Sequence, residues 1–166
     1  FTAAGELLRK NGIRFGYHNH DFEFKRVGER YAIDILYDSV PADLLFAEFD
    51  TCWVRFAGED PAAYIRKYAG RCPVVHLKDF VCDNIGKGDV PYALIDAAGN
   101  DDRKVENKKG FLFRPVGFGV QDIPAIVSAA EAAGSEYLIV EQDDCNGIDS
   151  LECAKQSRDY LASLGL

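Results

Sequence analysis

The chain lacks several features that would assign it to other protein classes. Its 166 residues include no methionine, one tryptophan and three histidines. No apolar run approaches the roughly 18 to 20 residues that span a bilayer, and the first residues do not resemble a signal peptide. We therefore expect no membrane insertion and a cytoplasmic location. Because the chain has no methionine and begins with Phe1, we also expect a fragment of a longer protein.

The cysteines and the basic residues argue against disulfide-rich, zinc-knuckle and nucleic-acid-binding proteins. The five cysteines are odd in number and form no CxxC pair, which disfavours disulfide frameworks and zinc knuckles and favours reduced thiols. Lysine and arginine total 19 against 27 aspartates and glutamates, giving a net charge of −8. Nucleic-acid binding depends on a basic surface, so we expect no nucleic-acid partner.

Apolar periodicity predicts an alternation of strands and helices. Asp60 followed by Pro61 is a typical helix start, and Gly134 a typical helix end. Strands are predicted over 13–18, 44–50, 73–78 and 137–141, and helices over 2–10, 61–69, 122–133 and 148–163. Residues 21–34 indicate a short hairpin or loop, and residues 81–113 a longer loop or hairpin excursion. Repeated strand–helix units in a single domain, 1–166, predict an α/β fold with a parallel sheet.

Ionisable residues follow the apolar part of each predicted strand. Parallel α/β folds place their chemistry at the carboxyl ends of strands, where the loops gather. The period-two alternation of a strand then selects one residue from each, namely His18, Asp50, His76 and Glu141. Two imidazoles and two carboxylates suit Mn²⁺, Zn²⁺, Mg²⁺, Co²⁺ or Fe²⁺, with coordination positions left open for a substrate's oxygens.

Each of these residues also has an ordinary structural interpretation. A histidine at a strand end often makes only a structural hydrogen bond, Asp50 is suited to cap the next turn, and Glu141 to pair with Lys78. Lys78 shares the face of His76 but lies about 6 to 7 Å further along the strand. We expect it beyond the metal, binding substrate, or else in an ion pair with Asp143 or Glu48. Since all three histidines lie at strand ends, the metal site is the favoured hypothesis.

Seven short motifs run through nearly the whole chain and together suggest a family. They are Gly16-Tyr-His-Asn-His-Asp-Phe-Glu-Phe24, Glu48-Phe-Asp-Thr-Cys-Trp53, Ala57-Gly-Glu-Asp-Pro61, Gly70-Arg71, His76-Leu-Lys-Asp79, Arg114-Pro-Val-Gly-Phe-Gly119 and Val140-Glu-Gln-Asp143. In this order they resemble the sugar phosphate isomerase/epimerase superfamily, also called xylose-isomerase-like TIM barrels. Each motif alone is weak evidence for the family, and none of them specifies a substrate.

The resemblance implies the C-terminal half of a (β/α)8 TIM barrel, with four parallel strands that match the fifth to the eighth and helices outside them. Four such units alone leave two exposed sheet edges and an uncovered inner face. We therefore expect truncation, or completion of the barrel by another chain or in a homo-oligomer.

The resemblance also implies roles for particular residues. Asp50, His76 and Glu141 match metal ligands, while His18 stands where the family usually has a glutamate. Glu141 keeps the expected role of catalytic base, and its partner could be His18, His20 or Glu23. Phe118 replaces a glutamate common in the family's Gly-Glu-Gly loop. The catalytic candidates are Glu141, His18 and Lys78, and the substrate-binding candidates are His20, Glu23, Trp53, Lys78 and Arg114.

The function these residues favour is isomerisation or epimerisation of a sugar or keto-sugar, begun by removal of a proton alpha to a carbonyl. A lyase or dehydratase acting on a keto-polyol or 3-keto-glycoside begins with the same step and is the alternative. An endonuclease on abasic DNA would need more zinc ligands and a basic face. A non-catalytic sugar-binding domain is the remaining hypothesis.

Overall fold

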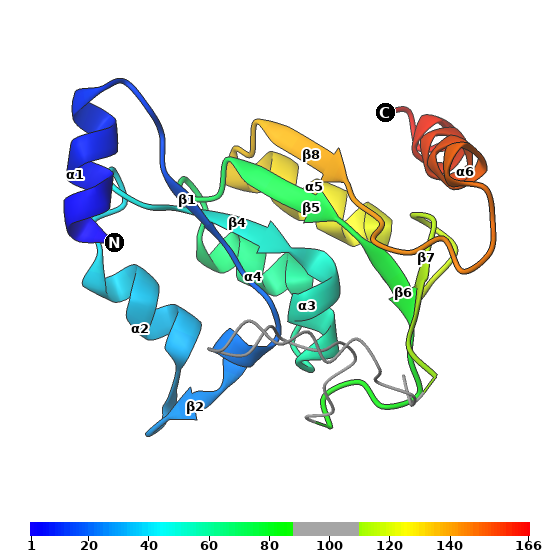
Figure 1. Cartoon of the computed structure of the whole chain (residues 1–166), viewed down its shortest axis with the longest axis horizontal. Helices are drawn as coiled ribbons and strands as arrows, with labels where there is room; N and C mark the ends of the chain where they lie inside the picture. The colour runs from blue at the N-terminus through cyan, green and yellow to red at the C-terminus, as the bar shows by residue number, and fades with distance from the viewer. Residues whose placement is uncertain (88–109) are drawn as a thin grey trace.

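Four parallel strands form the central sheet of the computed structural model, which describes residues 1–87 and 110–166 (Figure 1). They follow one another in space in the order β1 (Gly16–His18), β4 (Phe46–Asp50), β5 (Val74–Leu77) and β8 (Tyr137–Val140). All three pairings are parallel, and spatial order follows chain order. The predicted parallel half-barrel is confirmed. Each strand is shorter, by one to three residues, than the range that the apolar run predicted.

Helices precede, separate and follow the strands along the chain. They are α1 (Thr2–Lys10), α2 (Ala32–Ser39), α3 (Thr51–Phe56), α4 (Pro61–Lys67), α5 (Ile123–Ala133) and α6 (Ser150–Ser163). Asp60 caps α4 through a hydrogen bond from the Ala62 amide, and Gly134 ends α5 with a φ of 76°. Helices α4 and α5 pack against each other behind β4 and β5 (Figure 1).

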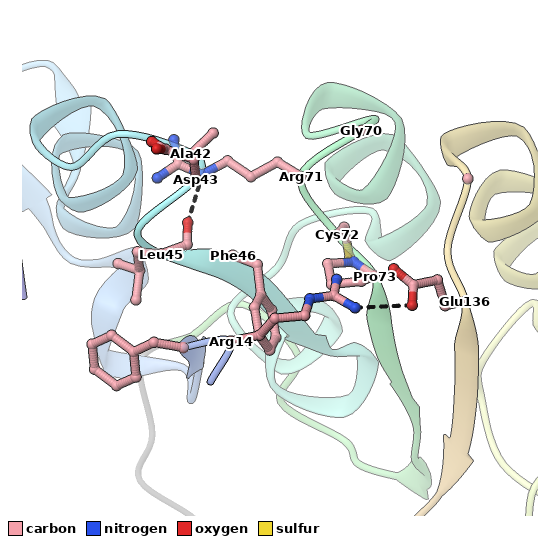
Figure 2. A pocket seen from close by; sticks show the side chains of 12 residues that line it. Arg14, Ala42, Asp43, Leu45, Phe46, Gly70, Arg71, Cys72, Pro73 and Glu136 are labelled. Atoms are coloured by element: carbon pink, nitrogen blue, oxygen red, sulfur yellow. Dashed lines mark hydrogen bonds and ion pairs between the residues drawn. The ribbon is translucent and has the colours of Figure 1, made fainter. Parts of the chain in front are cut away.

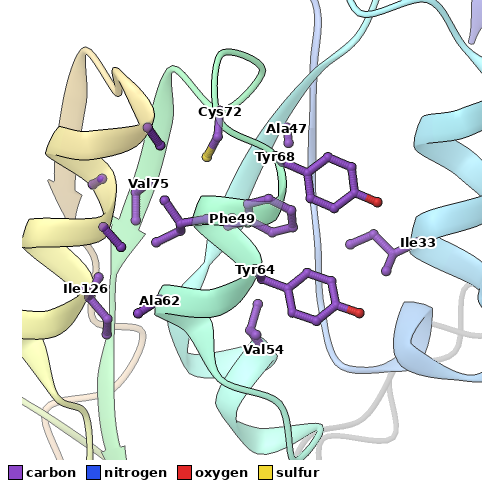
Figure 3. Packing of buried hydrophobic residues seen from close by; sticks show 14 of the residues in the cluster. Ile33, Ala47, Phe49, Val54, Ala62, Tyr64, Tyr68, Cys72, Val75 and Ile126 are labelled. Atoms are coloured by element: carbon purple, nitrogen blue, oxygen red, sulfur yellow. The ribbon is translucent and has the colours of Figure 1, made fainter.

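The main hydrophobic core lies between the sheet and these helices. Along β4 and β5, Ala47, Phe49, Val75 and Leu77 are fully buried, while the residues between them are only partly covered until Asp50. Figure 3 shows Phe49 and Val75 packing with side chains from α4 and α5, including Ile126. Each fully buried side chain of this kind stabilises the fold by about 1.5 to 3 kcal/mol. The helix-facing side therefore holds the sheet together, and Glu48 and His76 lie on the opposite face.

Two helices were not predicted. Helix α2 has only eight residues; it begins within residues 21–34, where a hairpin or loop was expected, and continues into a stretch for which no element was predicted. Helix α3 begins at Thr51, directly after β4 ends at Asp50, without glycine or proline to mark the boundary. Within residues 21–34 the predicted short hairpin is present as β2 (Arg26–Val27) and β3 (Arg30–Tyr31), preceded by the 3-10 turn η1 (Phe22–Phe24).

The excursion over residues 81–113 begins and ends in an antiparallel pair, β6 (Asp79–Val81) with β7 (Leu112–Arg114). Residues 88–109 of the predicted excursion lie outside the described part of the chain. Beyond β7 the chain folds around the buried Asp79 carboxylate.

That carboxylate accepts hydrogen bonds from four backbone amides, those of Phe80, Gly117, Gly119 and Gln121, at 2.9 to 3.2 Å. A Cβ at Gly119 would lie 2.2 Å from Asp79 Oδ1, so this position requires glycine. The intervening Phe118 is 55% exposed.

The outer strands leave apolar surface uncovered. On β8, Tyr137, Ile139 and Val140 are exposed, although they sit in a strand. Within the described residues, β1 and β8 each pair on one side only. No described helix combines the length and apolar character needed to cross a bilayer.

Candidate metal centre

The four strands bring the four residues of the predicted metal site together at their carboxyl ends. His18 ends β1, Asp50 ends β4, His76 lies in β5, and Glu141 follows β8 directly. Asp50 is the register partner of His76. One possible ligand atom from each residue lies within 4.8 Å of the others. Parallel pairing in chain order thus places four distant parts of the sequence around one point.

The two carboxylate oxygens of Asp50 have different environments. Oδ1 accepts hydrogen bonds from the amides of Cys52 at 2.9 Å and Trp53 at 3.3 Å, which caps α3. Oδ2 is fully buried and makes no hydrogen bond with any described residue, although it lies 3.4 Å from His18 Nε2 and 3.3 Å from Lys78 Nζ. The capping role and the site role of Asp50 are therefore both possible at once, each served by its own oxygen.

The rings of the two histidines meet edge to face at the centre, with centroids 4.7 Å apart. His76 Nδ1 lies 2.7 Å from Glu141 Oε2. Burial acts to lower the pKa of His18, but the carboxylates of Asp50 and Glu48 raise it more, so the net pKa is above its ordinary value. The site therefore carries an excess of negative charge that attracts a cation.

Lys78 was expected beyond the ligands, and this expectation is wrong. Its side chain is 3% exposed and turns into the centre, where Nζ lies 3.3 Å from Asp50, 3.2 Å from Glu141 and 2.9 Å from Asp143. The predicted ion pair with Asp143 is present. Burial would lower the pKa of Lys78, but these three carboxylates raise it well above its ordinary value. Lys78 thus stays charged.

Glu141 is held in its ionised form. Burial acts to raise its pKa, but the charge of Lys78 and the hydrogen bond with His76 lower it more, leaving it below its ordinary value. At neutral pH this side chain is a carboxylate, which is the form that either a metal ligand or a general base requires.

The remaining predicted residues lie in different settings. His20 and Trp53 stack with centroids 5.8 Å apart, and the His20 ring lies 5.4 Å from that of His18, so both border the centre. Glu23 is buried, and its two oxygens accept from the Tyr17 hydroxyl at 2.6 Å and from the His20 amide at 2.9 Å. These contacts give Glu23 an anchoring role for the loop.

Arg114 is half-buried on β7, where its backbone pairs with Asp79. Its side chain has no ion pair with the candidate ligands in the described part of the chain.

Three residues near the centre were not predicted as part of it. Glu48 lies between the two histidines, with Oε1 2.7 Å from His76 Nε2 and 3.4 Å from His18 Nδ1. The side-chain oxygen of the buried Asn19 accepts a hydrogen bond from the Asp50 amide. The buried Thr51 hydroxyl donates a hydrogen bond to the His76 carbonyl at 2.8 Å. Only Glu48 had a sequence signal, since it shares the strand face of Asp50.

The donor set fits a divalent first-row cation. It offers two imidazoles and two carboxylates, and Asp50 Oδ2 is a buried oxygen that lacks a hydrogen-bond donor among the described residues. Buried carboxylate oxygens ordinarily have a partner, and a cation would supply one here.

A separate cavity of about 200 Å³ lies at the opposite, amino-terminal end of the strands (Figure 2). Its charged groups are already satisfied: Arg14 pairs with Glu136 at 2.9 Å, and Arg71 donates to three backbone carbonyls. Barrel enzymes place their chemistry at the opposite, carboxyl-terminal end of the strands, so we assign these charge pairs a structural role.

Comparison with known proteins places this geometry in a family. A family model described as the xylose isomerase-like TIM barrel matches residues 1–164. The chain belongs to this family. A solved sugar phosphate isomerase/epimerase from Parabacteroides distasonis superposes with a TM-score of 0.70 at 26% identity, covering 97% of this chain and 49% of that one. An L-ribulose 3-epimerase structure, at 14% identity and a TM-score of 0.60, shares the fold.

Curated relatives include inosose dehydratases. That of Geobacillus thermodenitrificans is 26% identical over 162 residues, which is 95% of this chain and 50% of the relative. That of Clostridium beijerinckii is 34% identical over 83 residues, which is 50% of this chain and 27% of the relative. The chain therefore spans about half the length of relatives that match it along nearly its whole length.

Proposed function

We propose that this chain carries the metal centre and the catalytic base of a divalent-metal-dependent sugar or keto-sugar isomerase or epimerase. The observation that carries the proposal is the convergence of His18, Asp50, His76 and Glu141, from four strands, at the end of the sheet where such enzymes place their chemistry. Mn²⁺, Zn²⁺, Mg²⁺ and Co²⁺ all suit this donor set.

Glu141 is the proposed base. As an ionised carboxylate it takes the proton from the carbon alpha to the substrate's carbonyl, and the electron pair of that bond moves onto the carbonyl oxygen. Returning the proton to the former carbonyl carbon, while the hydroxyl proton on the alpha oxygen passes to the former carbonyl oxygen, completes an isomerisation. Returning the proton to the opposite face of the alpha carbon completes an epimerisation. A divalent cation bound by the four ligands would stabilise the negative charge that develops on the substrate oxygens. Lys78 adds a fixed positive charge beside Glu141.

His20 is the proposed group for returning the proton. Its imidazole lies beside that of His18 and stacks on Trp53 at the rim of the centre. Trp53 and Arg114 remain proposed contacts for the sugar.

A dehydratase is the second candidate, and the inosose dehydratases among the curated relatives favour it. The first step is again removal of the alpha proton by Glu141. The hydroxyl group beta to the carbonyl then leaves as water after protonation, which forms a carbon–carbon double bond. The same residues therefore serve a keto-polyol, which loses water, or a 3-keto-glycoside, which loses the alcohol of its glycosidic bond, and only the fate of the intermediate differs from that in an isomerase.

We further propose that four more strand–helix units close the barrel over the exposed residues of β8 and the free edge of β1, from the same polypeptide or from another copy. Support comes from the half-length match to relatives and from the exposed Tyr137, Ile139 and Val140. All five cysteines are free thiols, which supports a reduced, cytoplasmic setting.

Deuterium exchange tests the proposal. A protein that combines this chain with the missing half of the barrel is incubated in deuterated solvent with keto-sugars and with inosose, with and without added Mn²⁺ or Co²⁺. Metal-dependent exchange of the alpha proton is expected, and it should disappear in Glu141→Gln, because an amide cannot accept the proton. Loss of water from inosose without isomerised product would select the dehydratase. Normal exchange in Glu141→Gln would remove this residue from the mechanism.

A further inference from the structure

Glu48 contacts both histidines of the candidate centre. It lies on β4, two residues before Asp50, where its register partners are His18 on β1 and Val74 on β5. Its Oε1 atom is 2.7 Å from His76 Nε2 and 3.4 Å from His18 Nδ1. Because β4 lies between the strands that carry the histidines, one carboxylate can reach both rings.

The two ring nitrogens of each histidine contact different carboxylates. His18 turns Nδ1 to Glu48 and Nε2 to Asp50 Oδ2, at 3.4 Å. His76 turns Nε2 to Glu48 and Nδ1 to Glu141 Oε2, at 2.7 Å. In both rings the nitrogen that does not contact Glu48 is the one that points to the candidate ligands.

A neutral imidazole has one N–H donor and one acceptor nitrogen, while a carboxylate only accepts. With a cation bound, a hydrogen bond to Glu48 would hold the proton of His18 on Nδ1 and that of His76 on Nε2. The nitrogens that face Asp50 and Glu141, His18 Nε2 and His76 Nδ1, would then offer their lone pairs to the cation. A single oxygen has the two lone pairs needed to accept from both rings.

We infer that Glu48 is a positioning residue that sets the tautomer and orientation of both histidines for cation binding, and is not itself a ligand. This inference rests on the proposed metal centre and adds a residue to it. Partners that hold the far nitrogen of a ligating histidine typically change metal affinity 10-fold to 100-fold when removed.

Cobalt binding to the protein that combines this chain with the missing half of the barrel tests this inference. Co²⁺ affinity is measured by equilibrium dialysis, and the ligand set is followed by the visible absorption of the bound ion. Glu48→Leu should weaken Co²⁺ binding about 10-fold to 100-fold. Glu48→Gln should lie between Glu48→Leu and the wild type, because its amide oxygen still accepts a hydrogen bond. Glu136→Gln removes the same charge at the far end of the sheet and should bind as the wild type does.

Nitrogen-15 spectra of the same completed protein, loaded with Zn²⁺, add a readout that is independent of affinity. The wild type should show metal on His18 Nε2 and His76 Nδ1, with protons on the other two nitrogens. Wild-type affinity in Glu48→Leu, or an altered visible spectrum in Glu48→Gln that marks a lost ligand, would overturn the positioning role. Failure of the wild type to bind Co²⁺ would instead overturn the proposed centre, and the inference with it. Circular dichroism of each variant confirms that it is folded.

Discussion

His76 and Glu141 are 65 residues apart in the chain, yet His76 Nδ1 lies 2.7 Å from Glu141 Oε2. The parallel pairing of β5 with β8 produces this contact, because His76 is the register partner of Ile139, two residues before Glu141. A loop, the excursion and helix α5 lie between them in sequence without disturbing the pairing. The chemistry of the centre thus depends on sheet register.

Two substitutions at Asp50 should separate its two functions. Asp50→Asn keeps an oxygen to accept the Cys52 and Trp53 amides, so helix α3 should form normally while Co²⁺ binding is lost. Asp50→Ala removes the cap as well and should cost about 1 kcal/mol more in the free energy of unfolding. Urea denaturation and Co²⁺ dialysis measure the two effects. Equal Co²⁺ binding by Asp50→Asn and the wild type would exclude Asp50 from the ligand set.

Lys78→Met should destabilise the metal-free chain by about 3 kcal/mol, because it leaves the buried Asp50 without a positive charge. Added Co²⁺ should restore much of this loss, since the cation replaces the missing charge, so the variant should gain more thermal stability from metal than the wild type does. Lys155→Met, which breaks an exposed pair with Asp159, is the control and should change little. A similar loss in both variants would show that Lys78 has no special electrostatic role.

Asp79→Asn should destabilise the fold by about 3 kcal/mol, because an NH2 group would face backbone amides where a charged oxygen now accepts from them. Asp122→Asn is the matched control. Asp122 caps α5 through the Ala125 amide, and asparagine caps equally well, so stability should hardly change. Both values come from urea denaturation. An unchanged midpoint in Asp79→Asn would mean that the loop after β7 does not depend on this carboxylate.

The cysteines should differ in reactivity with iodoacetamide at pH 8. Burial raises the pKa of Cys72 to about 11 and that of Cys52 well above its usual range. At pH 8 the Cys72 thiolate is then only about one part in a thousand, and both thiols are sterically covered. Cys82 and Cys145 are partly exposed and should react first. Peptide mass spectrometry before and after unfolding in urea measures this order, and early labelling of Cys72 would show that the core opens.

Local sequence predicted much of the fold. Helix α1 has its predicted bounds, and α5 and the four strands differ from theirs by a few residues at the ends. Apolar periodicity and capping residues such as Asp60 operate over one or two turns, so they can be read from neighbouring residues. Helices α2 and α3 escaped prediction because short helices depend on packing against the sheet more than on their own sequence.

The sequence by itself determined which strand ends carry His18, Asp50, His76 and Glu141, because the period of a strand is a local property. Only the tertiary structure decided how their atoms are arranged: that Lys78 turns inward to Asp50, and that Glu48 reaches both histidines. These contacts join residues on neighbouring strands and depend on register and on the curvature of the sheet. Both are set by the packing of helices against the buried face, which involves the whole chain at once.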